Sequence, residues 1–254
     1  IGNSFSEDSI EQNLWQIANN QGVDMVIGNM YIGGCSIDRH FKNITEDIPD
    51  YRYCKITVDG KREWFKNSHL KDVIKDEDWD YVSIQQVSQE AGQPQSYTHL
   101  KEVVDWIRAN APHAKVVFHQ TWAYGPASTH GGFAKYDRDQ MKMYNAVVSV
   151  TREQARKAGI KKIIPTGTAL QDARTTKLGN DLTRDGFHMS KGFGRYLAAC
   201  TWFETITGKN VTRNTYVPDG SEKGTEAISE EEAVIARKAA HQAVAVPFHV
   251  VSLK

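Results

Sequence analysis

Three residues of this chain have the types and spacing that serine-dependent hydrolysis requires. Ser4 lies near the start, in the segment IGNSFS, and Asp185 and His188 stand close together in RDGFHMS. A serine hydroxyl becomes a good nucleophile when an imidazole accepts its proton and a carboxylate orients that imidazole. The spacing across Gly186 can place the acid and the base on one side of a tight turn. Ser4 is therefore a candidate nucleophile, with His188 as the candidate base and Asp185 as the candidate residue that orients it.

Each of these residues also has an ordinary structural explanation. Ser4 or Ser6 can cap the helix that the apolar periodicity after IGNSFS predicts, and the acid and the base can belong to a loop ahead of a capped helix. Cys35 and Ser36 follow a predicted strand and two glycines, but GCSID lacks the Gly-x-Ser-x-Gly pattern of a nucleophile elbow. Ser4 is preferred because it directly follows the first predicted strand.

Apolar segments followed by amphipathic ones recur in order along the chain, which indicates strands that each lead into a helix. One expected strand ends at residue 1, and the others cover 23–32, 79–87, 114–122 and 161–167. The expected helices cover 8–20, 97–110, 137–158 and 190–207, with Gly208 as the C-cap of the last. This alternation predicts an α/β fold, a three-layer α/β/α sandwich around a central parallel sheet of about five strands.

Two segments depart from this alternation. Residues 50–65, which include YRYCKITVDGKREWF, alternate aromatic and β-branched residues around Asp59-Gly60, a pair favoured in tight turns. This pattern predicts a β-hairpin insertion that stands off the sheet. Residues 209–254 form a C-terminal extension, a polar connection followed by a helix with an acidic first turn. We expect this extension to pack on the rest, so that 1–254 forms a single domain.

Ligands of open parallel sheets bind at the carboxyl ends of the strands, so the residues that follow each predicted strand are candidates for the site. Gly34 and Gln86 are in positions to supply a backbone N–H and a side-chain amide to an oxyanion, together with the Ser4 N–H. The residues expected to border the site and contact substrate are His40, His119, Trp122 and Tyr124. Taken singly, each of these residues could instead serve in turns or in packing.

In combination, these residues resemble the SGNH (GDSL-type) hydrolase superfamily, whose four blocks occur in the same order. The counterparts are GNSFS with Ser4, IGGCS with Gly34, IQQVS with Gln86, and DGFHMS with Asp185 and His188. The resemblance implies a flavodoxin-like sandwich, a Ser-His-Asp triad and an oxyanion hole formed by Ser4, Gly34 and Gln86.

Two positions differ from the superfamily pattern. Asn3 stands where the usual motif has aspartate, and the third block lacks glycine-x-asparagine. Gln86 resembles the glutamine of sialate O-acetylesterase-like members, while Gln85 and Gln89 remain open as alternatives. Five segments of the chain between residues 1 and about 208 resemble a bacterial branch known as DUF4886: IGNSFSED, IQQVS, TWAYG, IIPTGTALQDAR and RDGFHMSKGFGRYLAACTWFE.

The resemblance implies a serine esterase that acts through an acyl-enzyme. The expected mixture of aromatic and polar residues at the rim, without a long apolar lid, favours a short acyl group, such as acetyl, on a polar alcohol that could be a carbohydrate. A GDSL-type lipase or thioesterase for longer acyl chains is the first alternative. A catalytically inactive glycan-binding protein is the second, favoured by Asn3 and the atypical third block.

The composition of the chain indicates which classes of binding partner to expect. Lys plus Arg and Asp plus Glu number 31 each, so zero net charge offers no general attraction to nucleic acid or an anionic membrane. No segment has the roughly 20 apolar residues of a membrane span.

We expect no metal or other cofactor, because the histidines and cysteines lack ligand spacing. The scattered residues are His40, His119, His130, His188, Cys35, Cys54 and Cys200. From the start at Ile1 we expect a removed signal peptide and hence an exported protein.

Overall fold

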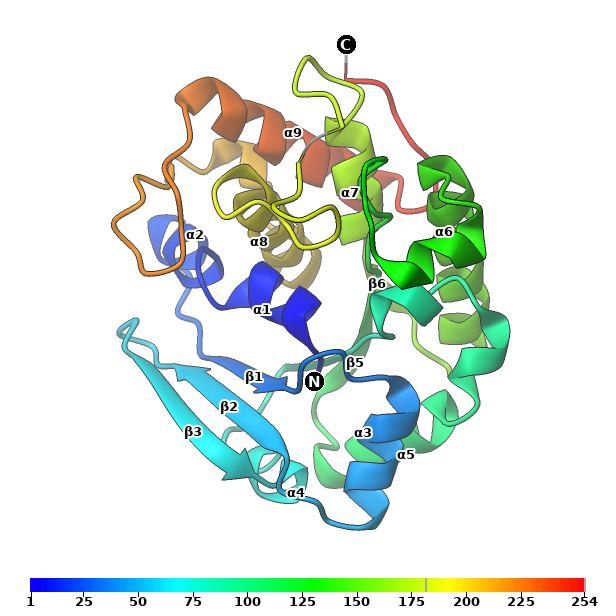
Figure 1. Ribbon diagram of the computed structural model, residues 1–254. Coiled ribbons are helices and arrows are strands. Elements are labelled where there is room, and N and C mark those ends of the chain that lie inside the picture. Colours follow the sequence, from blue (N-terminus) through cyan, green and yellow to red (C-terminus); the bar gives the residue numbers. More distant parts are fainter. Residues whose placement is uncertain (181, 254) are drawn as a thin grey trace.

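Six strands form two three-stranded sheets in the computed structural model, which describes residues 1–180 and 182–253. Residues 181 and 254, both within the single domain expected from the sequence, lie outside the described residues. One sheet is antiparallel in the order β1-β2-β3 and the other is parallel in the order β4-β5-β6 (Figure 1). The strands are β1 (Ile27–Tyr31), β2 (Tyr51–Ile56), β3 (Arg62–Ser68), β4 (Tyr81–Ile84), β5 (Lys115–His119) and β6 (Lys162–Ile164).

The first two residues lie between the sheets. Gly2 forms a parallel bridge with Tyr31 at the end of β1, and the Ile1 amine donates to the Ser83 carbonyl oxygen of β4 at 3.0 Å. Figure 1 accordingly shows the N-terminus near the middle of the molecule. The described strands therefore differ from the expected single sheet of about five parallel strands. The chain turns into a helix at Ser4, so residues 1–3 provide one bridge and no strand.

The hairpin expected at 50–65 is present as β2 and β3, which pair antiparallel. Its turn uses Gly60, whose φ of +82° is readily adopted only by glycine. The hairpin does not stand off the sheet as expected. β2 pairs in register along the whole of β1, from Ile27 opposite Ile56 to Tyr31 opposite Arg52, because an unpaired β1 edge would leave its backbone groups without partners.

The helices expected from the sequence are present with shifted boundaries. The expected helix 8–20 is divided in two, and Gly208 ends α8 in the left-handed conformation with φ of +71°. Three further helices, α3, α4 and α7, were not expected. The helices are α1 (Ser4–Ile10), α2 (Leu14–Asn20), α3 (Ile37–Thr45), α4 (Leu70–Val73), α5 (Leu100–Asn110), α6 (Gln140–Lys157), α7 (Thr166–Ala173), α8 (Phe193–Thr207) and α9 (Glu230–Ala245).

Two hydrophobic clusters lie on opposite faces of the strands. Neighbouring residues of one strand point to opposite faces, so Val117 belongs to one cluster and Phe118 to the other. The first cluster contains apolar residues of α1, α2, α7, α8 and α9, and the second contains those of α3 and α5. Helices therefore cover both faces of a mixed α/β arrangement, with α1 packed against α8 on the first face.

The C-terminal extension packs as expected, since α9 contacts both α7 and α8. Ser229 and Glu232 form a capping box at its start, so the acidic first turn faces unpaired backbone N–H groups. Cys35, Cys54 and Cys200 are buried thiols without a disulfide.

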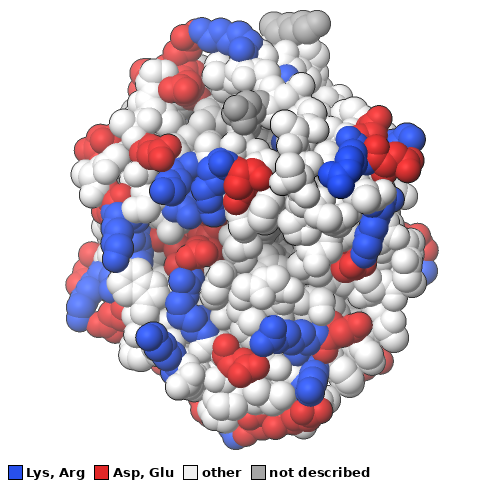
Figure 2. Space-filling model, in the orientation of Figure 1, with Lys and Arg blue, Asp and Glu red and all other residues white. Residues whose placement is uncertain are grey.

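Acidic and basic side chains are interspersed over the face shown in Figure 2, and uncharged surface runs through its middle. Within the described residues, no helix is both long and apolar enough to cross a membrane.

Candidate active site

Ser4 is the first residue of α1, and its position is set by the residue before it. Asn3 is the N-cap, with extended backbone, and its side-chain oxygen accepts the Phe5 N–H at 3.0 Å. Neither serine proposed as a cap has that role. Ser6 instead donates to Asn3 O and Asn29 Oδ1, both at 2.8 Å. The capping explanation of Ser4 is therefore removed, and its hydroxyl is available for another partner.

The acid and the base are on a tight turn that returns the chain between Thr183 and Met189, which form an antiparallel bridge. Gly186 has φ of +86°, and a Cβ there would lie 2.7 Å from the Cα of Ser128, so a side chain would be both strained and obstructed. One oxygen of Asp185 accepts the backbone N–H groups of Phe187 and His188 at 3.1 and 2.8 Å. This turn brings the acid and the base to one side.

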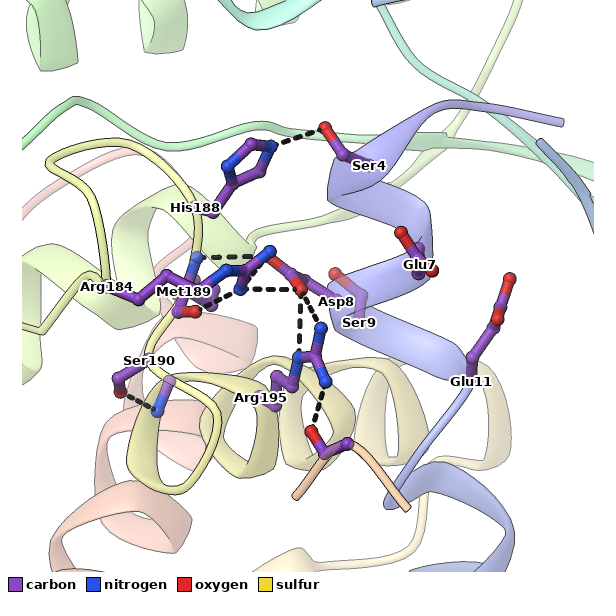
Figure 3. A network of polar contacts seen from close by, with 12 residues as sticks. Ser4, Glu7, Asp8, Ser9, Glu11, Arg184, His188, Met189, Ser190 and Arg195 are labelled. Atoms are coloured by element: carbon purple, nitrogen blue, oxygen red, sulfur yellow. Dashed lines mark hydrogen bonds and ion pairs between the residues drawn. The ribbon is translucent and has the colours of Figure 1, made fainter. Parts of the chain in front are cut away.

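Ser4, His188 and Asp185 form one continuous chain of hydrogen bonds. His188 Nδ1 lies 2.6 Å from Asp185 Oδ2. His188 Nε2 lies 2.9 Å from Ser4 Oγ, a contact drawn in Figure 3. An ionised carboxylate only accepts, so Nδ1 carries the proton of a neutral ring and Nε2 accepts the Ser4 hydroxyl. Burial raises the pKa of Asp185, but hydrogen bonds from the His188 ring and from two backbone N–H groups outweigh it and lower that pKa below its ordinary value.

A pocket of about 250 Å³ opens over Ser4 and His188. Backbone around Gly33 and Gly34 forms part of its wall, and aromatic side chains form much of the remainder. A larger cavity of about 410 Å³ lies beside the amino-terminal ends of β1 and β4 and contains neither Ser4 nor His188. The smaller pocket is therefore the candidate site. Its lining residues are Asn3, Ser4, Phe5, Tyr31, Gly33, Gly34, Val87, Ser88, Gln89, His130, Phe187 and His188.

The residues expected to supply backbone donors to an oxyanion line the pocket, but the expected side-chain donor does not. Among the described residues, neither the Ser4 N–H nor the Gly34 N–H has a hydrogen-bond acceptor, and both residues line the pocket. The expectation for Gln86 is corrected by its contacts. Its Oε1 accepts the backbone N–H groups of Ile37 and Val87, and its Nε2 donates to Ser96, so the buried amide holds loops together. Of the alternatives, Gln89 lines the pocket.

The model of the family described as "Domain of unknown function (DUF4886)" matches residues 1–243 of the chain. The chain belongs to the DUF4886 family. A crystal structure of a DUF4886 protein from Bacteroides uniformis ATCC 8492 is 44% identical, with a TM-score of 0.95 over 99% of this chain and 95% of that one. A protein from Slackia heliotrinireducens, provisionally assigned as an SGNH hydrolase, is 18% identical with a TM-score of 0.50, over 81% of this chain and 95% of that one. This second similarity concerns the fold alone. No curated protein matches the sequence.

A buried row of polar side chains in this DUF4886 protein holds Asn3, the residue before Ser4. Gln85 Nε2 donates to Asn3 Oδ1 at 2.7 Å, and Gln85 Oε1 accepts from His119 Nδ1 at 2.7 Å. His119 Nε2 then accepts from the Thr166 hydroxyl at 3.0 Å. Burial lowers the pKa of His119 to about 3, which keeps the ring neutral. Gln85 and His119 therefore position the start of α1 and do not face the pocket.

The four residues expected to border the site are all interior. His119 belongs to the row above, and His40 Nδ1 contacts the Tyr51 hydroxyl at 2.9 Å. Trp122 stacks on Phe5 and donates to the Phe187 carbonyl oxygen, and the Tyr124 hydroxyl contacts Ser88. The expectation is corrected because all four side chains are buried among interior partners and none lines the pocket. The aromatic side chains support the site from beneath.

Asp8, which sequence reasoning missed, ties the turn with Asp185 and His188 to α1. Asp8 lies one helical turn after Ser4 and is buried, with its carboxylate 2.9 Å from Arg184 Nη1 and 2.8 Å from Arg195 Nη2. It also accepts the Met189 N–H at 3.0 Å. Figure 3 shows His188 directed at Ser4 while the neighbouring turn converges on Asp8. The sequence offered no signal for this role, because an acidic residue at the start of a predicted helix is common.

We predict that Asp8→Asn destabilises the fold by about 3–5 kcal/mol, because it leaves the buried Arg195 guanidinium without its counter-charge. Glu7→Gln is the matched control on the same helix. Glu7 pairs with Arg52 at a partly exposed position, 3.1 Å apart, so its loss should cost at most about 1 kcal/mol. Urea unfolding of both variants measures the difference. Equal losses would contradict the role assigned to Asp8.

Within residues 1–180 and 182–253, no three histidine, cysteine, aspartate or glutamate side chains are grouped so that they could hold a metal ion. Of the four scattered histidines, His130 and His188 line the pocket.

Proposed function

We propose that this protein is an SGNH-type serine esterase that hydrolyses short-chain acyl esters, with acetyl as the preferred group. The observation that carries the proposal is the hydrogen-bonded chain from Ser4 Oγ through His188 to Asp185, at 2.9 and 2.6 Å. Nucleophilic catalysis by serine requires this combination of nucleophile, base and orienting carboxylate, and simple binding does not. The fold similarity to the Slackia protein agrees with the proposal.

In the proposed reaction, Ser4 Oγ attacks the ester carbonyl carbon while His188 Nε2 takes the hydroxyl proton. The resulting imidazolium returns that proton to the leaving alcohol as the carbonyl–alcohol bond breaks, which leaves an acyl ester on Ser4. Water then attacks this ester, with His188 again accepting and returning a proton, and releases the carboxylic acid. Asp185 holds Nδ1–H throughout and stabilises the imidazolium with its charge.

The negative charge on the carbonyl oxygen would be stabilised by the Ser4 and Gly34 N–H groups, which have no acceptor among the described residues. Backbone donors that are already oriented act without reorganisation during the reaction. Gln89 is the pocket amide from which a third donor could come.

The size of the pocket supports a short acyl group. About 250 Å³ has to accommodate both the acyl group and part of the alcohol, and the wall is made largely of aromatic rings and backbone. A long acyl chain would have to leave the pocket and lose contact with it. An uncharged polar ester is the substrate that this lining favours.

A series of p-nitrophenyl esters tests the proposal. We expect kcat/KM to be highest for acetate and to fall by about 10-fold or more between acetate and octanoate, because extra methylenes exceed the pocket. Ser4→Ala measured in parallel gives the background hydrolysis. A preference for octanoate or longer esters would favour a GDSL-type lipase or thioesterase, and hydrolysis equal to that background for every ester would contradict esterase activity.

A further inference from the structure

His130 and Phe187 lie beside His188 on the pocket wall and have no part in the proposed bond-breaking steps. The Phe187 ring centroid is 4.1 Å from that of His188 and 4.8 Å from that of His130, so Phe187 touches both imidazoles. The Phe187 backbone is held from beneath, where its carbonyl oxygen accepts from Trp122 at 2.7 Å. The two side chains therefore form a supported surface next to the proposed base.

The tautomer of His130 follows from its contact with the backbone. Its Nδ1 lies 3.0 Å from the Gly132 N, and a backbone N–H can only donate, so Nδ1 accepts and the proton of the neutral ring is on Nε2. Burial and then the neighbouring His188 lower the pKa of His130, which favours this neutral form. Among the described residues, His130 Nε2 has no hydrogen-bond partner, and it is not one of the buried unpaired polar atoms. His130 thus presents a free N–H donor of known position on the ring.

The chemistry of ester cleavage indicates what lies beside this donor. His188 returns its proton to the leaving alcohol, so the alcohol oxygen must come within hydrogen-bond reach of His188 Nε2. The alcohol therefore occupies the side of Ser4 on which His188, Phe187 and His130 lie. A ring face and a neutral N–H donor suit a saturated ring that has C–H groups on its face and hydroxyl groups at its edge.

We propose that Phe187 and His130 form the subsite for the leaving alcohol and that this alcohol is a sugar or similar cyclic polyol. Phe187 packs against the C–H face of the ring, and His130 Nε2–H donates to a hydroxyl oxygen near the ester. This inference rests on the proposed esterase function and adds the class of alcohol and the residues that select it.

Three acetate esters separate the subsite from the bond-breaking steps: a monoacetylated methyl glucoside, cyclohexyl acetate, and p-nitrophenyl acetate. The glucoside has a saturated ring with hydroxyls, cyclohexyl acetate has a saturated ring without them, and p-nitrophenyl acetate has a flat aromatic ring instead. The test variant is His130→Asn, because the asparagine oxygen can still accept the Gly132 N–H while the Nε2–H is removed. His130→Gln restores a donor near the Nε2 position. His69→Asn is the control, since His69 is remote from the pocket and contacts Asp47.

We expect His130→Asn to lower kcat/KM for the acetylated glucoside about 10-fold, as the loss of one hydrogen bond implies. Cyclohexyl acetate and p-nitrophenyl acetate should change less than about 2-fold, because neither has a ring hydroxyl near the ester to accept from that N–H. His130→Gln should recover part of the loss. Phe187→Leu should lower kcat/KM for the two esters with saturated rings, with p-nitrophenyl acetate affected least.

If His130→Asn lowers kcat/KM equally for all three esters, the proposed subsite is overturned, because an equal loss would indicate a structural effect on the bond-breaking steps. An unchanged rate on the glucoside would overturn it as well. A wild-type protein that hydrolyses p-nitrophenyl acetate but does not prefer the glucoside to cyclohexyl acetate would remove the sugar subsite and leave the esterase proposal standing. A wild-type protein inactive on all three esters would remove both.

Discussion

Ser4→Ala is expected to lower kcat on p-nitrophenyl acetate by about 10⁴- to 10⁶-fold. The residual activity should be what the backbone N–H donors and substrate binding in the pocket provide without the nucleophile. The magnitude is large because the variant removes the atom that forms the acyl-enzyme. His188→Ala should cause a loss of similar size, since Ser4 Oγ has its proton acceptor at 2.9 Å in His188 Nε2. The two losses should not add in the double variant, because the residues act as one unit.

A fluorophosphonate probe with peptide mapping checks this result without a known substrate. The label should appear on Ser4 in the wild-type protein and be absent in Ser4→Ala and His188→Ala. Ser36→Ala is the control, because Ser36 is the rival nucleophile in the sequence but caps α3 by accepting the Arg39 N–H. A label that remains in Ser4→Ala and disappears in Ser36→Ala would refute the proposed mechanism.

Asp185→Asn is expected to lower kcat by about 10⁴-fold with the fold intact. The asparagine oxygen can keep the contacts with the Phe187 and His188 backbone N–H groups, at 3.1 and 2.8 Å in the wild type. Its NH₂ group then faces His188 Nδ1 and can only donate, so Nδ1 becomes the acceptor and the ring proton moves to Nε2. His188 in that tautomer cannot accept the Ser4 hydroxyl proton.

The effect on stability has a predicted pH dependence. The folded pKa of Asp185 is lowered from 3.8, so the carboxylate stabilises the fold above that value and loses this contribution as pH falls through the folded pKa. The difference in unfolding midpoint between wild type and Asp185→Asn should therefore be present at neutral pH and vanish in strong acid. Asp38→Asn is the control, since Asp38 accepts from His99 in an exposed pair at 2.8 Å. A loss of kcat below about 10-fold in Asp185→Asn would contradict the orienting role.

Much of the local structure could be predicted from the sequence because it depends on short-range chemistry. Alternating aromatic and β-branched residues around Asp59-Gly60 predicted the hairpin, and Gly208 predicted the end of α8. The spacing of Asp185 and His188 across Gly186 predicted their shared side of a turn, since three residues and one left-handed glycine leave few alternatives. The order of the four blocks added Ser4, which lies at the predicted strand-to-helix transition.

Where neighbouring residues were of the same type, the sequence did not show which of them faces the site. The tertiary structure decided it. Gln85, Gln86 and Gln89 follow the same strand, and the loops packed against them turn Gln85 toward Asn3, Gln86 toward Ser96 and Gln89 to the pocket. The same holds for the expected substrate residues: Trp122 lies at the predicted end of its strand, but Phe5 covers it.

The sequence by itself determined which residues could do chemistry and the local turns that present them, because those depend on residue type and on contacts a few positions apart. Only the tertiary structure decided which of them meet. Asp8 lies 176 positions from Arg184, and the 2.9 Å contact between them holds the turn of His188 against the helix of Ser4. Such long-range contacts depend on how whole elements pack, since a charge is tolerated in the interior only where residues distant in the sequence come close enough to neutralise it.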